Sequence, residues 1–109
     1  MDYNKLVRDK IPDIIKQNNE IPFTHTADDE EYKEKLYEKL KEEVDEFIES
    51  DTAEELADIL EVLREICDIK GVSMRNLDSL RKKKRKERGG FDKRIILERK
   101  EIPDSVDSE

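Results

Sequence analysis

The sequence predicts an all-α fold, an antiparallel bundle of helices with short extended segments near its N- and C-terminal ends. Three observations support this fold class. Apolar residues between positions 32 and 69 recur at the spacing of helix faces, residues that favour helix ends stand at the borders of these stretches, and no Pro- or Ser-rich linker divides the chain. Although 48% of the 109 residues are charged and only 34% are apolar, this ordering argues against a disordered chain.

The first elements are expected to be short. After an extended start, Asp9 is predicted to cap a short helix that carries Pro12 in its first turn and stops at Asn18 and Asn19. Residues 21–26 alternate in polarity but contain a proline, which predicts at most an edge strand.

Two long helices follow and are joined by a short connection. The first is expected to begin after a cap formed by Asp28 or Asp29 and to run to about residue 50. The Asp-Thr pair at 51 and 52 then offers a new N-cap, with Glu55 at the capping-box position. The second helix ends near residue 70, where Gly71 supplies a stop.

A third helix is expected to begin after a cap at Ser73 and to end at about residue 88, before Gly89 and Gly90. Within residues 91–102, the stretch 94–99 predicts a strand or an extended arm. We expect one domain over residues 1–103 and a disordered tail over residues 104–109.

Composition excludes several kinds of site. The single Cys67 excludes an internal disulfide and a cysteine-based metal cluster, which favours a cytoplasmic protein. The single His25 excludes a multi-histidine metal site, and three glycines form neither a dinucleotide fingerprint nor a P-loop. No apolar run approaches the roughly 20 residues of a membrane span, so we expect no membrane partner. Any chemistry therefore falls to carboxylates, lysines and arginines.

Charge is separated along the chain. The net charge is −8, but residues 28–68 are dominated by Glu and Asp, whereas residues 81–88 read R-K-K-K-R-K-E-R. This separation indicates a ligand that needs both signs, such as a nucleotide with its metal or another copy of the chain. Two solvated helix faces are the alternative.

Four carboxylates fall in unexpected places when the long helices are projected at 100° per residue. In the first helix, Glu43 lies inside the apolar stripe and Glu46 lies at its edge. In the second, Glu55 projects between two apolar residues and Asp58 lies at the same border. Each helix therefore carries an acidic pair at i, i+3 beside its apolar face.

Antiparallel packing through these apolar faces, which a short connection favours, would bring the four carboxylates together. Without a cation they would repel one another and lose solvation. Oxygen-only ligands of this charge suit Mg²⁺, for which Mn²⁺ can substitute. We therefore predict metal ligands at Glu43, Glu46, Glu55 and Asp58. The alternative is that the helices are merely rich in Glu and that these side chains reach solvent from the boundary.

Several motifs then resemble a known family. Residues 42–46 fit E-E-x-x-E and residues 55–58 fit E-x-x-D, which together are similar to the metal signature of the MazG-like and phosphoribosyl-ATP pyrophosphohydrolase-like all-α NTP pyrophosphatases. The opening Y-N-K-L-V-R-D-K-I-P at 3–12 and the closing K-x-x-x-R-G-G-F at 84–91 resemble a small single-domain branch of that group. The resemblance extends from residue 3 to about residue 97.

The resemblance implies Mg²⁺-dependent hydrolysis of a nucleoside triphosphate between its α and β phosphates. Removal of non-standard nucleotides is one role that such an activity would serve. Glu42, beside the predicted ligands, is a candidate catalytic base or water-orienting group. Cations must bind the phosphates, because an acidic site repels a bare triphosphate. The candidates are Lys84 and Arg88, one turn apart on the third long helix, and Lys5, Arg8 and Lys10 in the opening motif.

Other functions remain open from the sequence. One is a phosphoribosyl-ATP pyrophosphatase-like activity, and another is a helical interaction module without catalysis. A nucleic-acid-binding module using residues 81–88 is disfavoured by the net charge of −8 and by the absence of aromatic residues in that run.

We also expect a homodimer or higher homo-oligomer. The second long helix is apolar over roughly 240° of its circumference, wider than the stripe of about 100° that a surface helix needs. If the apolar side chains along one side of this helix were exposed to solvent, they would drive association between copies of the chain. These residues are Ile59, Val62, Ile66 and Ile69. Members of the resembled family assemble through helices, and a partner subunit could supply cations to each site.

Overall fold

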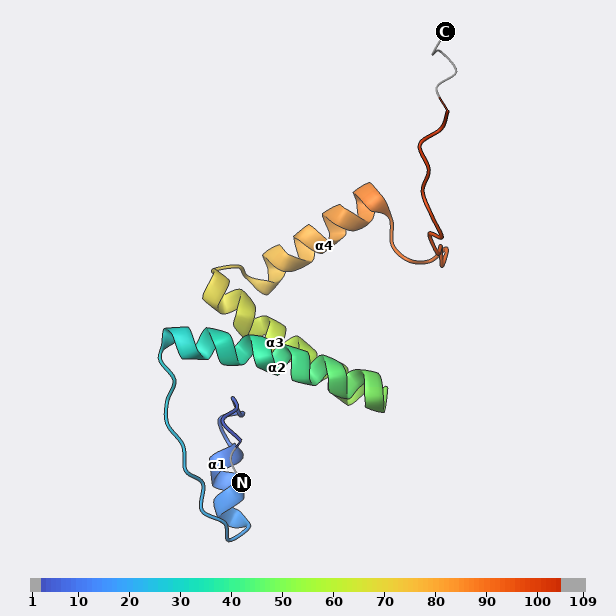
Figure 1. Ribbon diagram of the computed structural model, residues 1–109. Coiled ribbons are helices and arrows are strands. Elements are labelled where there is room, and N and C mark those ends of the chain that lie inside the picture. The colour runs from blue at the N-terminus through green and yellow to red at the C-terminus, as the bar shows by residue number, and fades with distance from the viewer. Residues whose placement is uncertain (1–2, 105–109) are drawn as a thin grey trace. The chain divides into compact units, whose positions relative to one another are not determined.

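The computed structural model describes residues 3–104 and contains, within that range, four helices and no strand (Figure 1). The helices are α1 (Ile11–Gln17), α2 (Asp29–Ser50), α3 (Ala53–Lys70) and α4 (Met74–Arg88). The predicted all-α fold class is confirmed. No helix in the described part of the chain is long and apolar enough to cross a membrane.

The chain divides after Leu77 into two compact units. The first contains α1, α2, α3 and the first residues of α4, and the second contains the rest of α4 and the segment that follows it. The single domain over residues 1–103 stays a prediction. The predicted disordered tail, 104–109, lies outside the described residues except for Asp104.

The ends of α2 follow from its sequence. The Asp28 carboxylate accepts a hydrogen bond of 2.9 Å from the backbone N–H of Glu31, which confirms the predicted N-cap. Acidic residues fill the first turn, where they interact favourably with the helix dipole. At the other end Asp51 adopts a left-handed conformation with φ 54°, and its N–H donates to the carbonyl of Phe47 at 2.7 Å. This turn leads directly into α3.

The start of α3 differs from the predicted capping box. Thr52 occupies the N-cap position, but its side chain makes no capping hydrogen bond. The Glu55 carboxylate lies instead beside Glu43 of α2, with an oxygen of each within 4.8 Å of the other. The predicted stop at Gly71 is confirmed: with φ 70°, its N–H donates to the carbonyl of Asp68 at 3.1 Å.

Neither segment with strand character forms a strand, which leaves the extended-arm alternative for residues 94–99, and one predicted cap is wrong. Residues 21–26 and 94–99 form no strand in the structure, since neither segment finds a neighbouring strand to accept its backbone hydrogen bonds within the described residues. Lys10 rather than Asp9 is the N-cap of α1, and Pro12 lies in the first turn as expected. The Ser73 cap of α4 is confirmed, because its hydroxyl accepts a hydrogen bond of 3.0 Å from the N–H of Asn76.

Helices α2 and α3 run antiparallel and pack side by side (Figure 1). Their interface forms a small core of Leu36, Val62 and Ile66, which are 1%, 7% and 9% exposed. Leu6, Tyr32 and Leu40 pack against it. Val62 and Ile66 are therefore covered by the chain itself, which corrects the expectation that they belong to an exposed row.

Replacement of Leu36 by Ala should lower the free energy of unfolding by about 2–5 kcal/mol, because Leu36 fills the centre of the α2–α3 interface and Ala would leave a cavity. Urea unfolding followed by circular dichroism measures this change. Leu97→Ala is the control, since that side chain is 77% exposed. Equal effects of the two substitutions would contradict this core.

Candidate metal centre

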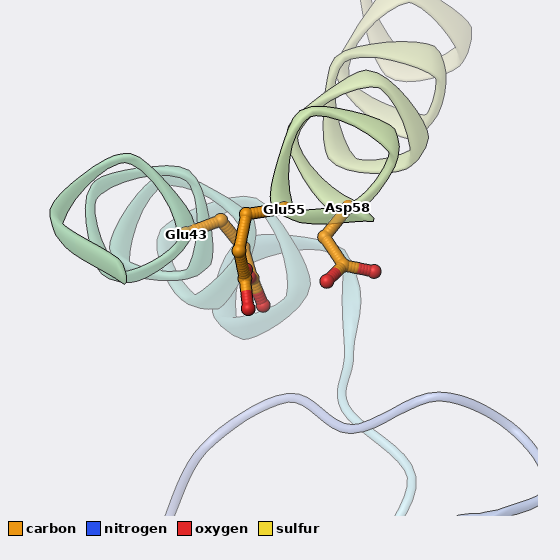
Figure 2. Close-up of side chains that lie close together, drawn as sticks. All are labelled: Glu43, Glu55 and Asp58. Atoms are coloured by element: carbon orange, nitrogen blue, oxygen red, sulfur yellow. The ribbon is translucent and has the colours of Figure 1, made fainter. Parts of the chain in front are cut away.

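Three carboxylates meet at the α2–α3 interface. Glu43 projects from α2, and Glu55 and Asp58, one turn apart, project from α3 to the same side of the helix pair (Figure 2). One oxygen of each residue lies within 4.8 Å of the other two. The antiparallel arrangement thus unites three of the four predicted ligands, as the helical projection required.

Two oxygens of this cluster have no hydrogen-bond partner. They are Oε2 of Glu43 and Oε2 of Glu55, and both are buried. Buried polar atoms in folded proteins are almost always hydrogen-bonded, so two such oxygens facing other carboxylates need an explanation. A hard divalent cation takes oxygen ligands of this kind. The residues present therefore fit a metal ion.

The closeness of the carboxylates also raises the pKa of two of these side chains. Desolvation, a hydrogen bond shared with Glu43 and the nearby carboxylates of Glu46 and Asp58 raise the pKa of Glu55 to about 7. Desolvation and the neighbouring carboxylate of Glu43 also raise the pKa of Glu46. Glu46 is not in the group of three close carboxylates, so its role as a fourth ligand stays a prediction.

Basic side chains border the cluster. A nitrogen of the Arg8 guanidinium lies 2.6 Å from Oδ1 of Asp58, and the Lys39 ammonium lies 3.3 Å from Oε1 of Glu43. Lys39 was not among the sequence-predicted site residues, although its i, i+4 spacing to Glu43 is the signal that could have found it. These cations offset part of the negative charge of the cluster.

Glu42 lies between two lysines. Its carboxylate oxygens are 3.3 Å from the Lys5 ammonium and 3.5 Å from the Lys39 ammonium. The same three residues line an open pocket of about 130 Å³ together with Leu6, Lys35 and Glu38. Lys35 is a second basic residue that the sequence did not indicate. The pocket is smaller than a typical ligand site of about 300 Å³ or more, so it cannot enclose a nucleotide.

The remaining predicted phosphate-binding residues are exposed. Lys10 is exposed at the N-cap of α1. Lys84 and Arg88 are exposed on the part of α4 that belongs to the second unit. Contact of these three residues with phosphates therefore stays a prediction.

Comparison with protein families matches residues 6–80 to the model of the phosphoribosyl-ATP pyrophosphohydrolases. The matched stretch covers more than half of the chain and includes every carboxylate of the cluster as well as Arg8 and Lys39. No curated protein and no solved structure matches the chain.

The shift at Glu55 predicts how the stability of the metal-free protein depends on pH. In the unfolded chain Glu55 titrates near 4.5, and in the folded chain near 7, so between these values the folded state binds more protons. The free energy of unfolding should therefore decrease as pH rises from 5 to 8. Urea unfolding in the presence of a chelator measures this trend, and Glu55→Gln should reduce its slope. Stability that rises with pH over this interval in the wild type would contradict the crowded cluster.

Proposed function

The chain belongs to the phosphoribosyl-ATP pyrophosphohydrolase family, of the MazG-like all-α NTP pyrophosphatase superfamily, and from this premise we propose that it is an Mg²⁺-dependent enzyme that hydrolyses nucleoside triphosphates between the α and β phosphates. The family supports a pyrophosphohydrolase activity, and the substrate and the metal are the proposed part. The observation that carries the proposal is the convergence of Glu43, Glu55 and Asp58 with two unpartnered buried oxygens.

The proposed ligands are Glu43, Glu55 and Asp58, with Glu46 as the fourth. Carboxylate oxygens favour Mg²⁺ or Mn²⁺ over softer metals. When bound, a divalent cation supplies charge neutralisation at the phosphates and lowers the pKa of a bound water. Burial of Glu43 at the helix interface fixes the direction of its carboxylate, so the ligand set is held by packing before any ion arrives.

Glu42 is the proposed base. The attacking water forms a bond to phosphorus, the bond to the bridging oxygen between the α and β phosphates breaks, and Glu42 takes the proton of the water. Nucleoside monophosphate and pyrophosphate are the products. Lys5 and Lys39 pair with different oxygens of the Glu42 carboxylate, beside Glu43.

The phosphates need cations beyond the metal, because the first unit is strongly acidic. Arg8 and Lys5 already lie at the carboxylates and are the nearest candidates. Lys10, Lys84 and Arg88 complete the proposed phosphate-binding set. An Arg guanidinium binds phosphate oxygens through two parallel hydrogen bonds, which suits Arg8 and Arg88 to this role.

The family description names phosphoribosyl-ATP, itself a nucleotide with a triphosphate, as one substrate to test. Non-standard nucleoside triphosphates are the other, which would make the protein a cytoplasmic house-cleaning enzyme. Incubation with a panel of nucleoside triphosphates, phosphoribosyl-ATP and Mg²⁺, followed by measurement of released pyrophosphate, separates these substrates. Release of inorganic phosphate in place of pyrophosphate would contradict the proposed bond cleavage.

Replacement of Glu43 by Gln should lower pyrophosphate release by at least about 100-fold, since Gln keeps the shape but removes the charge of a metal ligand, and even outer residues of metal sites cost 10–100-fold. Calorimetric titration with Mn²⁺ should show weaker binding in the same variant. Glu34→Gln makes the same charge change at an exposed position of α2 and is the control. Full activity of Glu43→Gln would exclude this metal centre.

A second copy of the chain is the proposed partner, because few apolar residues are buried among residues 3–104. Tyr37, Val44 and Ile48 form one row on α2 and are 40%, 36% and 72% exposed. Leu56 and Leu60 form a row on α3 and are 50% and 52% exposed. Both rows lie about 100° or more around their helices from the carboxylates. Two such helix pairs, packed symmetrically through these rows, would complete a four-helix bundle and leave the metal centres accessible.

Sedimentation equilibrium at micromolar concentration should give a mass of at least twice the chain mass of 12.9 kDa. Leu60→Glu should shift the protein toward monomer, because it places a charge in the apolar contact. Leu97→Glu is the control, since Leu97 lies outside these rows and is 77% exposed. A wild-type protein that is monomeric and active would exclude the dimer.

A further inference from the structure

The segment before α1 reaches one of the proposed metal ligands. Arg8 donates a hydrogen bond of 2.6 Å to Oδ1 of Asp58, a residue fifty positions later in the sequence. Asp58 contributes a ligand oxygen to the group of three carboxylates. In the structure, a guanidinium therefore interacts with a carboxylate that a metal ion would need.

The ion pair between Arg8 and Asp58 is one that a competing cation can displace. The side chains of Arg8 and Asp58 are 58% and 35% exposed, and ion pairs this exposed are weak. The Arg8 side chain remains protonated at any ordinary pH. The ion pair is therefore broken by displacement of the guanidinium from Asp58, and not by loss of a proton. Arg8 also precedes α1, so its movement breaks no helix.

We propose that Arg8 is an exchangeable countercharge: it neutralises Asp58 while the metal centre is empty, and it moves to a substrate phosphate when a divalent cation binds Asp58. The proposal rests on the function proposed above. It assigns Arg8 two successive partners, a carboxylate of this chain and a phosphate of the ligand.

Leu6 keeps Arg8 close to the site after the exchange. Leu6, two residues before Arg8, packs against the core of Leu36, Val62 and Ile66. The neighbouring Lys5 is paired with Glu42, which lies beside the ligand Glu43. The segment is thus anchored on both the core and the site edge, and the released guanidinium stays within reach of a phosphate held at the metal. Its planar donors match phosphate oxygens.

The exchange couples the two ligands. Arg8 opposes metal binding when no phosphate is present, because it competes for Asp58 and adds a positive charge. It favours metal binding when a phosphate is present, because the phosphate gives the displaced guanidinium a new partner. By linkage, the metal strengthens phosphate binding by the same factor.

Calorimetric titration of the metal-free protein with Mn²⁺ alone tests the first half. Arg8→Gln should bind Mn²⁺ roughly 2- to 5-fold more tightly than the wild type, the range expected for loss of one exposed ion pair. Arg81→Gln removes the same charge from another exposed pair, with Asp78 at 2.9 Å, and should leave Mn²⁺ affinity unchanged. Arg8→Lys keeps the competing charge and should bind Mn²⁺ like the wild type. Unchanged or weaker Mn²⁺ binding by Arg8→Gln would overturn the competition.

Titration with inorganic pyrophosphate at saturating Mn²⁺ tests the second half. Arg8→Gln should bind pyrophosphate about 10-fold or more weakly, because a hydrogen bond to a charged group is lost. Unchanged pyrophosphate affinity would overturn the transfer to phosphate. If the wild type binds no Mn²⁺ at all, the proposed metal function fails instead, which separates the two outcomes. Circular dichroism of each variant verifies that its helix content equals that of the wild type.

Discussion

Repulsion among carboxylates at the α2–α3 interface is the constraint on which the site depends. Glu43 is buried between two helices, and one of its oxygens lies within 4.8 Å of oxygens of Glu55 and Asp58. Burial of like charges is unfavourable unless protons or cations compensate. The rest of the site supplies this compensation: a raised pKa at Glu55, and basic residues at the borders of the cluster.

The charges that compensate the carboxylates differ in how easily they are displaced. Lys39 is one turn from Glu43 on the same helix, so its ammonium neutralises the cluster wherever α2 is formed. The proton on Glu55 and the guanidinium of Arg8 are both exchangeable, because one titrates near neutral pH and the other belongs to an exposed ion pair. In the proposed function, a divalent cation would compete with the exchangeable charges and leave the Lys39 ammonium in place. The cluster therefore carries both a fixed positive charge and exchangeable ones.

The exposed apolar rows and the carboxylate cluster lie on different sides of the α2–α3 pair. The core of Leu36, Val62 and Ile66 is small for a chain of 109 residues, since a domain of this length usually buries roughly two-thirds of the surface that its unfolded chain exposes. The exposed rows on α2 and α3 point away from the carboxylates, so association through them would add buried apolar area without closing the proposed site. The proposed association and the proposed catalysis would thus use different faces of the same two helices.

The sequence by itself determined the helices, most of their ends and the acidic pairs, because caps such as Asp28 and Ser73, stops such as Gly71 and the 3.6-residue period are local properties of the chain. Three results required tertiary structure. Glu55 fits a capping box by sequence, yet the adjacent α2 draws its carboxylate to Glu43. Val62 and Ile66 are covered because antiparallel packing brings Leu36 against them. Arg8 meets Asp58 across fifty residues. Each depends on which side chains two distant segments bring together, and no local pattern encodes that contact.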